Sequence, residues 1–115
     1  DMGHMKAIIL GEHIMENRDA LTGFLGFLED NPAVAGNIYV FVTEDMEELM
    51  RLDGQGVDSV GDYLTGILEN TMDQKKEKAV ILQDLYGAWH REEEFPKLPE
   101  VTIVNKKPSI CQHSG

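Results

Sequence analysis

Two short apolar runs, joined by an amphipathic stretch, constrain the fold of this chain most strongly. The runs extend from about Lys6 to Leu10 and from Ile38 to Val42, and both are rich in Ile, Val or aromatic residues. Continuous apolar runs of this length are typical of strands that are buried on both faces. The chain between them is long enough for a crossover helix. The sequence therefore predicts a βαβ unit with parallel strands and a right-handed connection.

The stretch between the runs predicts a helix that packs one face on the sheet. Asn17 is the expected N-cap, and Asp19 places a carboxylate in the first turn, where it complements the helix dipole. The residues expected to be buried follow the spacing i, i+3, i+4, i+7: Leu21, Phe24, Leu25 and Leu28. Gly23 and Gly26 are expected to allow close approach to the sheet. Pro32, preceded by Asn31, ends the helix.

The rest of the chain predicts further helices and a third strand. Asp45 and Glu48 form a capping-box pattern that begins a short helix, with Met46, Leu49 and Met50 facing inward. Further helices are predicted at about 59–70 and 79–91, separated by a charged connection at 73–78, and a strand at 101–104; residues 106–115 are predicted to be a loop. The fold class is α/β: one domain over residues 1–115, with a small, mainly parallel sheet of about three strands and about four helices.

Charge and composition exclude several classes of partner. The 115 residues carry a formal net charge of −11, which argues against binding to nucleic acid or anionic lipid. A single cysteine, Cys111, supplies no disulfide framework, and no apolar run is long enough to span a bilayer. The histidines are scattered, so we expect neither a metal site nor a cofactor.

Polar residues follow both predicted strands, where ligands bind in open α/β sheets. Glu12 and His13 come after the first strand, and Glu44 follows the second. These three residues are the candidates for a ligand pocket. The alternative is that Glu12 and His13 are ordinary surface residues at a helix approach, and that the acidic residues after Thr43 serve to cap a helix.

The sequence also carries weak signals for catalysis and for partner binding. A hydrolase or transferase using Glu12 and His13 lacks an accompanying nucleophile or metal set, and no phosphate loop is present, so we expect no enzyme. Met46, Met50 and Tyr86 are candidates for a partner-binding surface. The alternative is that they fill or border the core.

Three segments of the chain carry a resemblance to a known family. They read GHMKAIILGE at residues 3–12, FLEDNP at residues 27–32 and NIYVFV at residues 37–42. In this pattern the chain resembles the Ger(x)C family, the C subunits of bacterial spore germinant receptors. The resemblance covers most of the chain, but only in outline over residues 53–78. Glu29 stands where the family pattern has arginine, and Asn31 intervenes before the proline.

The resemblance implies a non-catalytic receptor component that acts as an interaction module in the response to nutrient germinants. Such proteins are lipoproteins on the outer face of the spore inner membrane, and they assemble with integral membrane subunits. The chain would then be a soluble internal fragment, mainly of the N-terminal domain, that meets the membrane only through a lipid anchor outside it. The resemblance assigns no binding residues. The alternative function is a small-ligand-binding α/β domain with its pocket at the carboxyl ends of the strands.

Overall fold

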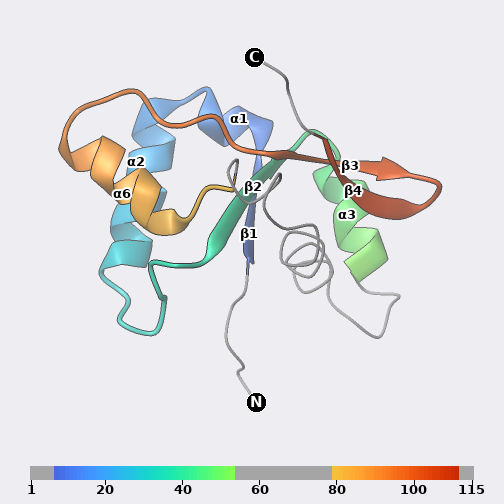
Figure 1. Ribbon diagram of the computed structural model, residues 1–115, viewed down its shortest axis with the longest axis horizontal. Helices are drawn as coiled ribbons and strands as arrows, with labels where there is room; N and C mark the ends of the chain where they lie inside the picture. The colour runs from blue at the N-terminus through green and yellow to red at the C-terminus, as the bar shows by residue number, and fades with distance from the viewer. Residues whose placement is uncertain (1–6, 54–78, 112–115) are drawn as a thin grey trace.

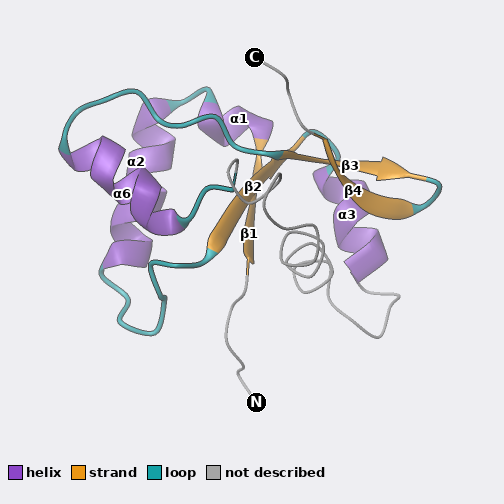
Figure 2. Ribbon diagram, viewed as in Figure 1, coloured by secondary structure: helices purple, strands orange, loops and turns teal. Residues whose placement is uncertain are grey.

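The fold is a small α/β arrangement around one mixed sheet (Figures 1 and 2). The structure is a computed structural model and describes residues 7–53 and 79–111. Its elements in chain order are β1 (Ala7–Gly11), α1 (Glu12–Met15), α2 (Arg18–Glu29), β2 (Tyr39–Thr43), α3 (Met46–Asp53), α6 (Leu82–His90), β3 (Glu100–Val104) and β4 (Lys107–Cys111). The predicted α/β class and mainly parallel sheet are confirmed. The helix predicted at 59–70 and the charged connection at 73–78 lie outside the described residues.

The strand pairing confirms the βαβ unit and sets where each strand ends. The sheet order is β1-β2-β3-β4; β1 pairs with β2 in parallel, from Ala7 opposite Tyr39 to Gly11 opposite Thr43. β3 is also parallel to β2, but it overlaps it only at the pairs Val42–Glu100 and Thr43–Val101. β3 therefore begins where β2 ends, and the β3–β4 hairpin extends past the other strands (Figure 1).

β1 and β2 contribute apolar side chains to both faces of the sheet, as their non-alternating runs predicted, whereas the packed apolar residues of β3 and β4 belong to one face. On one face, strand residues such as Leu10 and Val40 pack with α2 and α6. On the opposite face, Phe41 and Val101 pack with Leu49 of α3. The large core lies on the α2/α6 face because two long amphipathic helices cover it there (Figure 2).

Local sequence signals explain the bounds of α2. The Asn17 side chain accepts a hydrogen bond from the Ala20 N–H at 3.1 Å, which satisfies one of the free donors at the helix start. Three of the four residues expected inside are buried, and Phe24 is half-buried. A Cβ on Gly26 would lie 3.4 Å from the Trp89 ring. This glycine therefore allows close approach to α6, whereas the sequence predicted close approach to the sheet.

Hydrogen bonds to backbone groups close both ends of α6. The Asp84 carboxylate accepts a hydrogen bond from the Ile81 N–H at 3.0 Å at the start of α6. At the other end, Glu92 adopts a left-handed conformation with φ of 57°. The Glu93 N–H then reaches back to the Ala88 carbonyl at 2.8 Å, which closes the helix end as in a Schellman motif.

The sequence-based prediction was wrong about the end of the chain. Residues 107–111 are not a loop but form β4, which pairs antiparallel with β3. Asn105 and Lys106 both have positive φ, 53° and 64°, as in the tight two-residue turns that join hairpin strands. Pro108 is compatible with this strand because β4 lies at an edge of the described sheet.

One helix was not predicted, and one expectation is corrected. β1 ends at Gly11, and the unpredicted four-residue helix α1 begins at the next residue, Glu12. In α3 only Leu49 is buried, whereas Met46 is half-buried and Met50 is 66% exposed, so Met50 does not face inward. Through Leu49, α3 packs on the cluster of buried residues on this face of the sheet.

Candidate functional site

Three carboxylates from three neighbouring strands meet at one edge of the sheet. Glu12 follows β1, Glu44 follows β2, and Glu100 begins β3. One carboxylate oxygen of each lies within 4.8 Å of the others. Glu12 and Glu100 are half-buried and Glu44 is exposed. We call this group the carboxylate cluster.

The strand register brings the cluster together. Gly11 is paired with Thr43, so the residues that follow them, Glu12 and Glu44, leave the sheet side by side. Val42 is paired with Glu100, which places the start of β3 at the same level. The buried Thr43 hydroxyl donates a hydrogen bond to the Val101 carbonyl at 2.8 Å and accepts one from the Asp45 N–H at 2.9 Å. This side chain therefore ties β2 to β3 while it turns the chain into α3.

Mutual repulsion and hydrogen bonding change the protonation of the cluster. The pKa of Glu12 is raised, first by a hydrogen bond with Glu44, then by desolvation, and further by the negative charges of Glu44, Glu100 and Glu16. A hydrogen bond between two carboxyl groups requires a proton on one of them, so the pair holds that proton to higher pH than an isolated glutamate.

Carboxylate oxygens are the ligands that hard cations such as Ca²⁺ and Mg²⁺ prefer. Acidic groups at this spacing are also common on protein surfaces that bind no ion, so the spacing of Glu12, Glu44 and Glu100 assigns no metal by itself. The expectation that the chain lacks a metal site stays a prediction.

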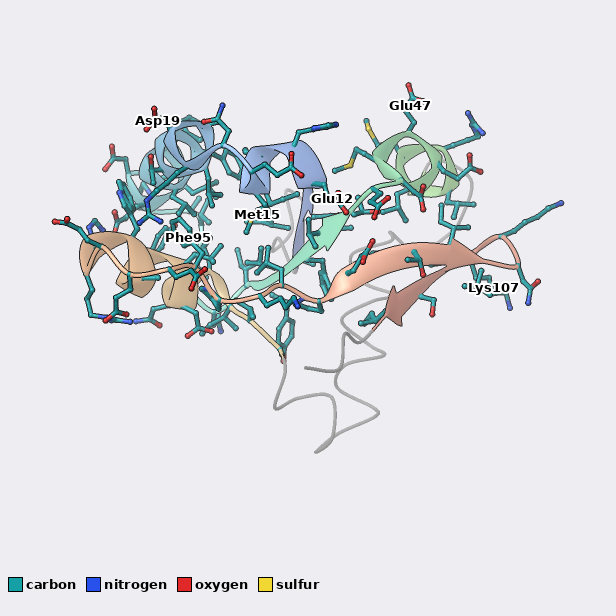
Figure 3. All side chains as sticks on the ribbon, turned by 90° about the horizontal axis from the view of Figure 1, so that it is seen from above. Glu12, Met15, Asp19, Glu47, Phe95 and Lys107 are labelled. Atoms are coloured by element: carbon teal, nitrogen blue, oxygen red, sulfur yellow. The ribbon has the colours of Figure 1, made fainter. Side chains whose placement is uncertain are left out.

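An open cleft of about 650 Å³ adjoins the carboxylate cluster, and Glu12 and Glu100 line one part of it. Its apolar lining includes Met15, Val42, Phe95 and Leu98. Figure 3 shows Glu12, Met15 and Phe95 following one another from the sheet edge towards the α2/α6 side. We call this space the strand-end cleft. Its position at the ends of β1 and β2 is the one predicted for a ligand pocket.

Arg18 fixes the far wall of the strand-end cleft. Its guanidinium lies 4.5 Å from the centroid of the Phe95 ring, within the range of a cation–π contact. The same guanidinium donates a hydrogen bond to the Glu93 carbonyl at 3.3 Å. Arg18 thus holds the 93–95 segment against the start of α2.

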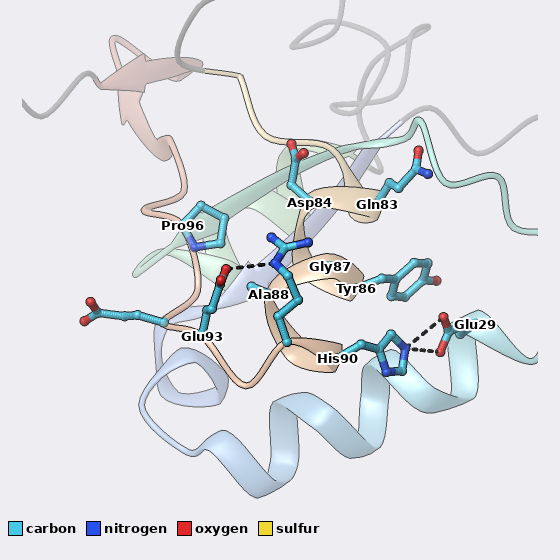
Figure 4. A pocket seen from close by; sticks show the side chains of 11 residues that line it. Glu29, Gln83, Asp84, Tyr86, Gly87, Ala88, His90, Glu93 and Pro96 are labelled. Carbon is cyan, nitrogen blue, oxygen red and sulfur yellow. Dashed lines mark hydrogen bonds and ion pairs between the residues drawn. The ribbon is translucent and has the colours of Figure 1, made fainter.

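A second open cleft, of about 760 Å³, lies along α6 (Figure 4). Four of the residues that line it form two pairs: His90 Nε2 lies 3.0 Å from a Glu29 carboxylate oxygen, and Arg91 donates to Glu93 at 3.0 Å. All four side chains are substantially exposed, so these pairs contribute little stability. This cleft therefore offers few charged groups that are not already engaged with one another.

The structure brings some of the predicted ligand residues together and separates others. Glu12 and Glu44 meet in the carboxylate cluster. His13 is exposed and belongs neither to the cluster nor to the lining of the strand-end cleft. Sequence reasoning missed Glu100, whose only signal was a carboxylate directly before the apolar run at residues 101–104.

The predicted partner residues lie on different faces of the sheet. Met46 and Met50 belong to α3, whereas Tyr86 belongs to α6 and packs against the large core. The Tyr86 hydroxyl is buried without a hydrogen-bond partner among the described residues, and burial together with the charge of Glu29 raises its pKa. These three residues do not form one continuous patch.

Fold and site together define a small α/β domain with an acidic cleft at the strand ends. Residues 1–103 match the profile of a protein family described as the spore germination protein N-terminal domain. The chain therefore belongs to this family, as the resemblance in residues 3–42 implied. No curated protein and no solved structure matches the chain significantly. Within residues 7–53 and 79–111, every helix is too short or too polar to cross a membrane.

Proposed function

We propose that this chain is a non-catalytic part of a spore germinant receptor and acts there as an interaction module. The observation that carries the proposal is the family match over residues 1–103 to the N-terminal domain of a spore germination protein. The proposed partners are the integral membrane subunits of the receptor. The proposed location is the outer face of the spore inner membrane, reached through a lipid anchor outside this segment.

The proposed contact surface is centred on α3. Met50 is 66% exposed and Met46, one turn earlier, is half-buried, so the helix presents flexible apolar side chains next to the small core. Exposed methionines can adapt to a partner surface. Tyr86, half-buried on α6, is proposed as a separate contact because part of its ring stays accessible.

A matched pair of substitutions tests the α3 surface. Phe27 of α2 is 67% exposed, about as much as Met50, but it lies on the opposite side of the sheet. We expect Met50→Lys in the full-length protein to reduce recovery of the integral membrane subunits by affinity purification about tenfold, a typical loss at an interface anchor. Phe27→Lys should leave recovery unchanged. Equal recovery with both variants would contradict the assignment of α3.

The second candidate function is small-ligand binding at the strand-end cleft. The observation in its favour is that Glu12 and Glu44, which follow parallel neighbouring strands, adjoin an open space of about 650 Å³ with both apolar and charged walls. Glu12→Ala should then weaken the response of the domain to its ligand. An unchanged response in that variant would count against this function.

A further inference from the structure

We propose that the turn of the β3–β4 hairpin, residues 104–107, binds an acidic protein surface that has a shallow apolar recess. We call these four residues the hairpin tip. The inference rests on the first proposed function, an interaction module, and adds to it a second contact of stated chemistry. It does not depend on the contact through α3 or on a ligand in the strand-end cleft.

The hairpin tip projects from the sheet. β2 pairs with β3 only as far as Thr43 opposite Val101, so residues 102–104 of β3 pair with β4 alone. Three strand residues rise about 10 Å beyond that last pair. Figure 3 shows Lys107 at the opposite end of the molecule from Phe95. A partner can therefore reach the tip without contacting the α2/α6 end of the domain.

The backbone of the hairpin tip is ordered by the hairpin itself. Asn105 and Lys106 both have positive φ, as in the two-residue turns whose twist matches that of the flanking strands. β3 and β4 stay paired up to the turn, where Val104 lies opposite Lys107. A turn that is already ordered loses little conformational entropy when a partner binds to it.

Two positive charges at the hairpin tip are not neutralised by ion pairs. Lys106 and Lys107 are exposed, and neither forms an ion pair with a described residue. Arg51 and Arg91, in contrast, each pair with a nearby glutamate, at 2.7 and 3.0 Å. In a chain with a formal net charge of −11, the two adjacent lysines form a local patch of opposite sign. Such a patch favours a negatively charged partner surface.

The hairpin tip also carries an exposed apolar side chain. Val104 is 53% exposed and is one of three exposed large hydrophobic residues in the described chain, with Phe27 and Met50. Its branched side chain is stiff, so covering it costs little entropy. The tip thus presents a small apolar group next to two cations, which fits a recess with an apolar floor and an acidic rim.

Other anionic partners fit the hairpin tip less well. Each lysine strengthens attachment to an anionic membrane only about fivefold, and a membrane would also repel the rest of a chain with a net charge of −11. Segments that enter the membrane interface carry Trp, Phe or Leu, whereas the tip carries a single Val. A recessed protein surface contacts the tip alone, and the tip projects by more than the Debye length of about 8 Å at physiological salt.

Charge reversal in the full-length protein tests the hairpin tip. We expect Lys107→Glu to reduce recovery of the integral membrane subunits by affinity purification about fivefold, because attraction between opposite charges becomes repulsion. Lys97→Glu makes the same charge change at an exposed lysine outside the tip and should leave recovery unchanged. Val104→Ser should reduce recovery about threefold, since it removes half-buried methyl groups from the contact. Thermal melts establish that each variant is folded.

The contrary outcomes separate this inference from the proposed function. Equal recovery with Lys107→Glu and Lys97→Glu would overturn the inference and leave the interaction module and its α3 contact intact. Unchanged recovery of the subunits, together with weaker sedimentation of Lys107→Glu with phosphatidylglycerol vesicles, would overturn it in favour of a membrane contact. No recovery of the subunits by the unmodified protein would overturn the proposed function and the inference together.

Discussion

The two faces of the sheet are built from equally apolar strands but differ in what covers them. Among the described residues, the cluster on the α2/α6 face holds eleven buried hydrophobic residues and that on the α3 face holds four. Leu25 and Leu85 anchor the first, and Leu49 is the single buried residue of α3. In this part of the chain the difference comes from the helices, because α2 and α6 contribute more buried residues than α3. Among the described residues, the proposed partner surface lies beside the smaller of the two clusters.

The largest expected effect breaks the α2/α6 core. Leu25→Ala removes a side chain that is 1% exposed between α2 and the sheet, and should cost about 3–4 kcal/mol of unfolding free energy. Leu49→Ala on the other face should cost about 2 kcal/mol, because among the described residues Leu49 packs in the smaller buried cluster. Urea denaturation of both variants measures the difference. Equal costs would contradict the ranking of the two faces.

A smaller effect concerns the buried polar group that joins β2 to β3. Thr43→Val keeps the shape of the side chain but removes its hydroxyl. The Val101 carbonyl then loses this donor, and the Asp45 N–H loses this acceptor. The expected cost is about 1–2 kcal/mol, again from urea denaturation. Thr43→Ser keeps both hydrogen bonds and should recover most of the loss. A serine variant as weak as the valine variant would show that the methyl group, not the hydroxyl, is needed.

A substitution at the end of α6 is expected to stabilise the fold. Glu92 has φ of 57° at the end of α6, a conformation that costs non-glycine residues about 1 kcal/mol. Glu92→Gly should raise the unfolding free energy by about 0.5 kcal/mol after the entropy cost of glycine. Glu94→Gly, in the extended segment just beyond, is the control and should not stabilise. A thermal melt of each variant distinguishes them.

The smallest expected effect on stability concerns Glu12 in the carboxylate cluster. The raised pKa of Glu12 means that the folded state favours its protonated form. The resulting stability is fully present below the pKa of the unfolded chain and is lost as pH rises through the folded pKa. Glu12→Gln should therefore raise the urea midpoint at pH 7, and this gain should vanish in acid.

The control for this prediction is Glu47→Gln, which lowers the net negative charge equally but lies outside the carboxylate cluster. Both variants and the unmodified chain are compared from neutral to acidic pH. A gain at pH 7 that is no larger for Glu12→Gln than for Glu47→Gln would mean that overall charge, not the cluster, sets the effect.

Predictions from local signals succeeded where the signal and the structure share the same few residues. The Asn17 cap, the buried series in α2 and the end of that helix before Pro32 depend on contacts within a turn or two. The strand at 107–111 was missed because Lys107 and Pro108 are poor strand formers, and only pairing with β3 makes them a strand. Met50 was placed inward because periodicity cannot tell how wide a buried stripe will be.

The βαβ unit, the apolar character of both sheet faces and the family could be inferred from the amino-acid sequence. It also placed Glu12 and Glu44 at strand ends, because parallel strands bring their carboxyl ends to one edge. The position of Glu100 beside them could not be inferred in this way, because it depends on β3 overlapping β2 by just two residue pairs. Strand register is set by packing between distant segments and has no local signature, so the carboxylate cluster and its cleft exist only in the folded chain.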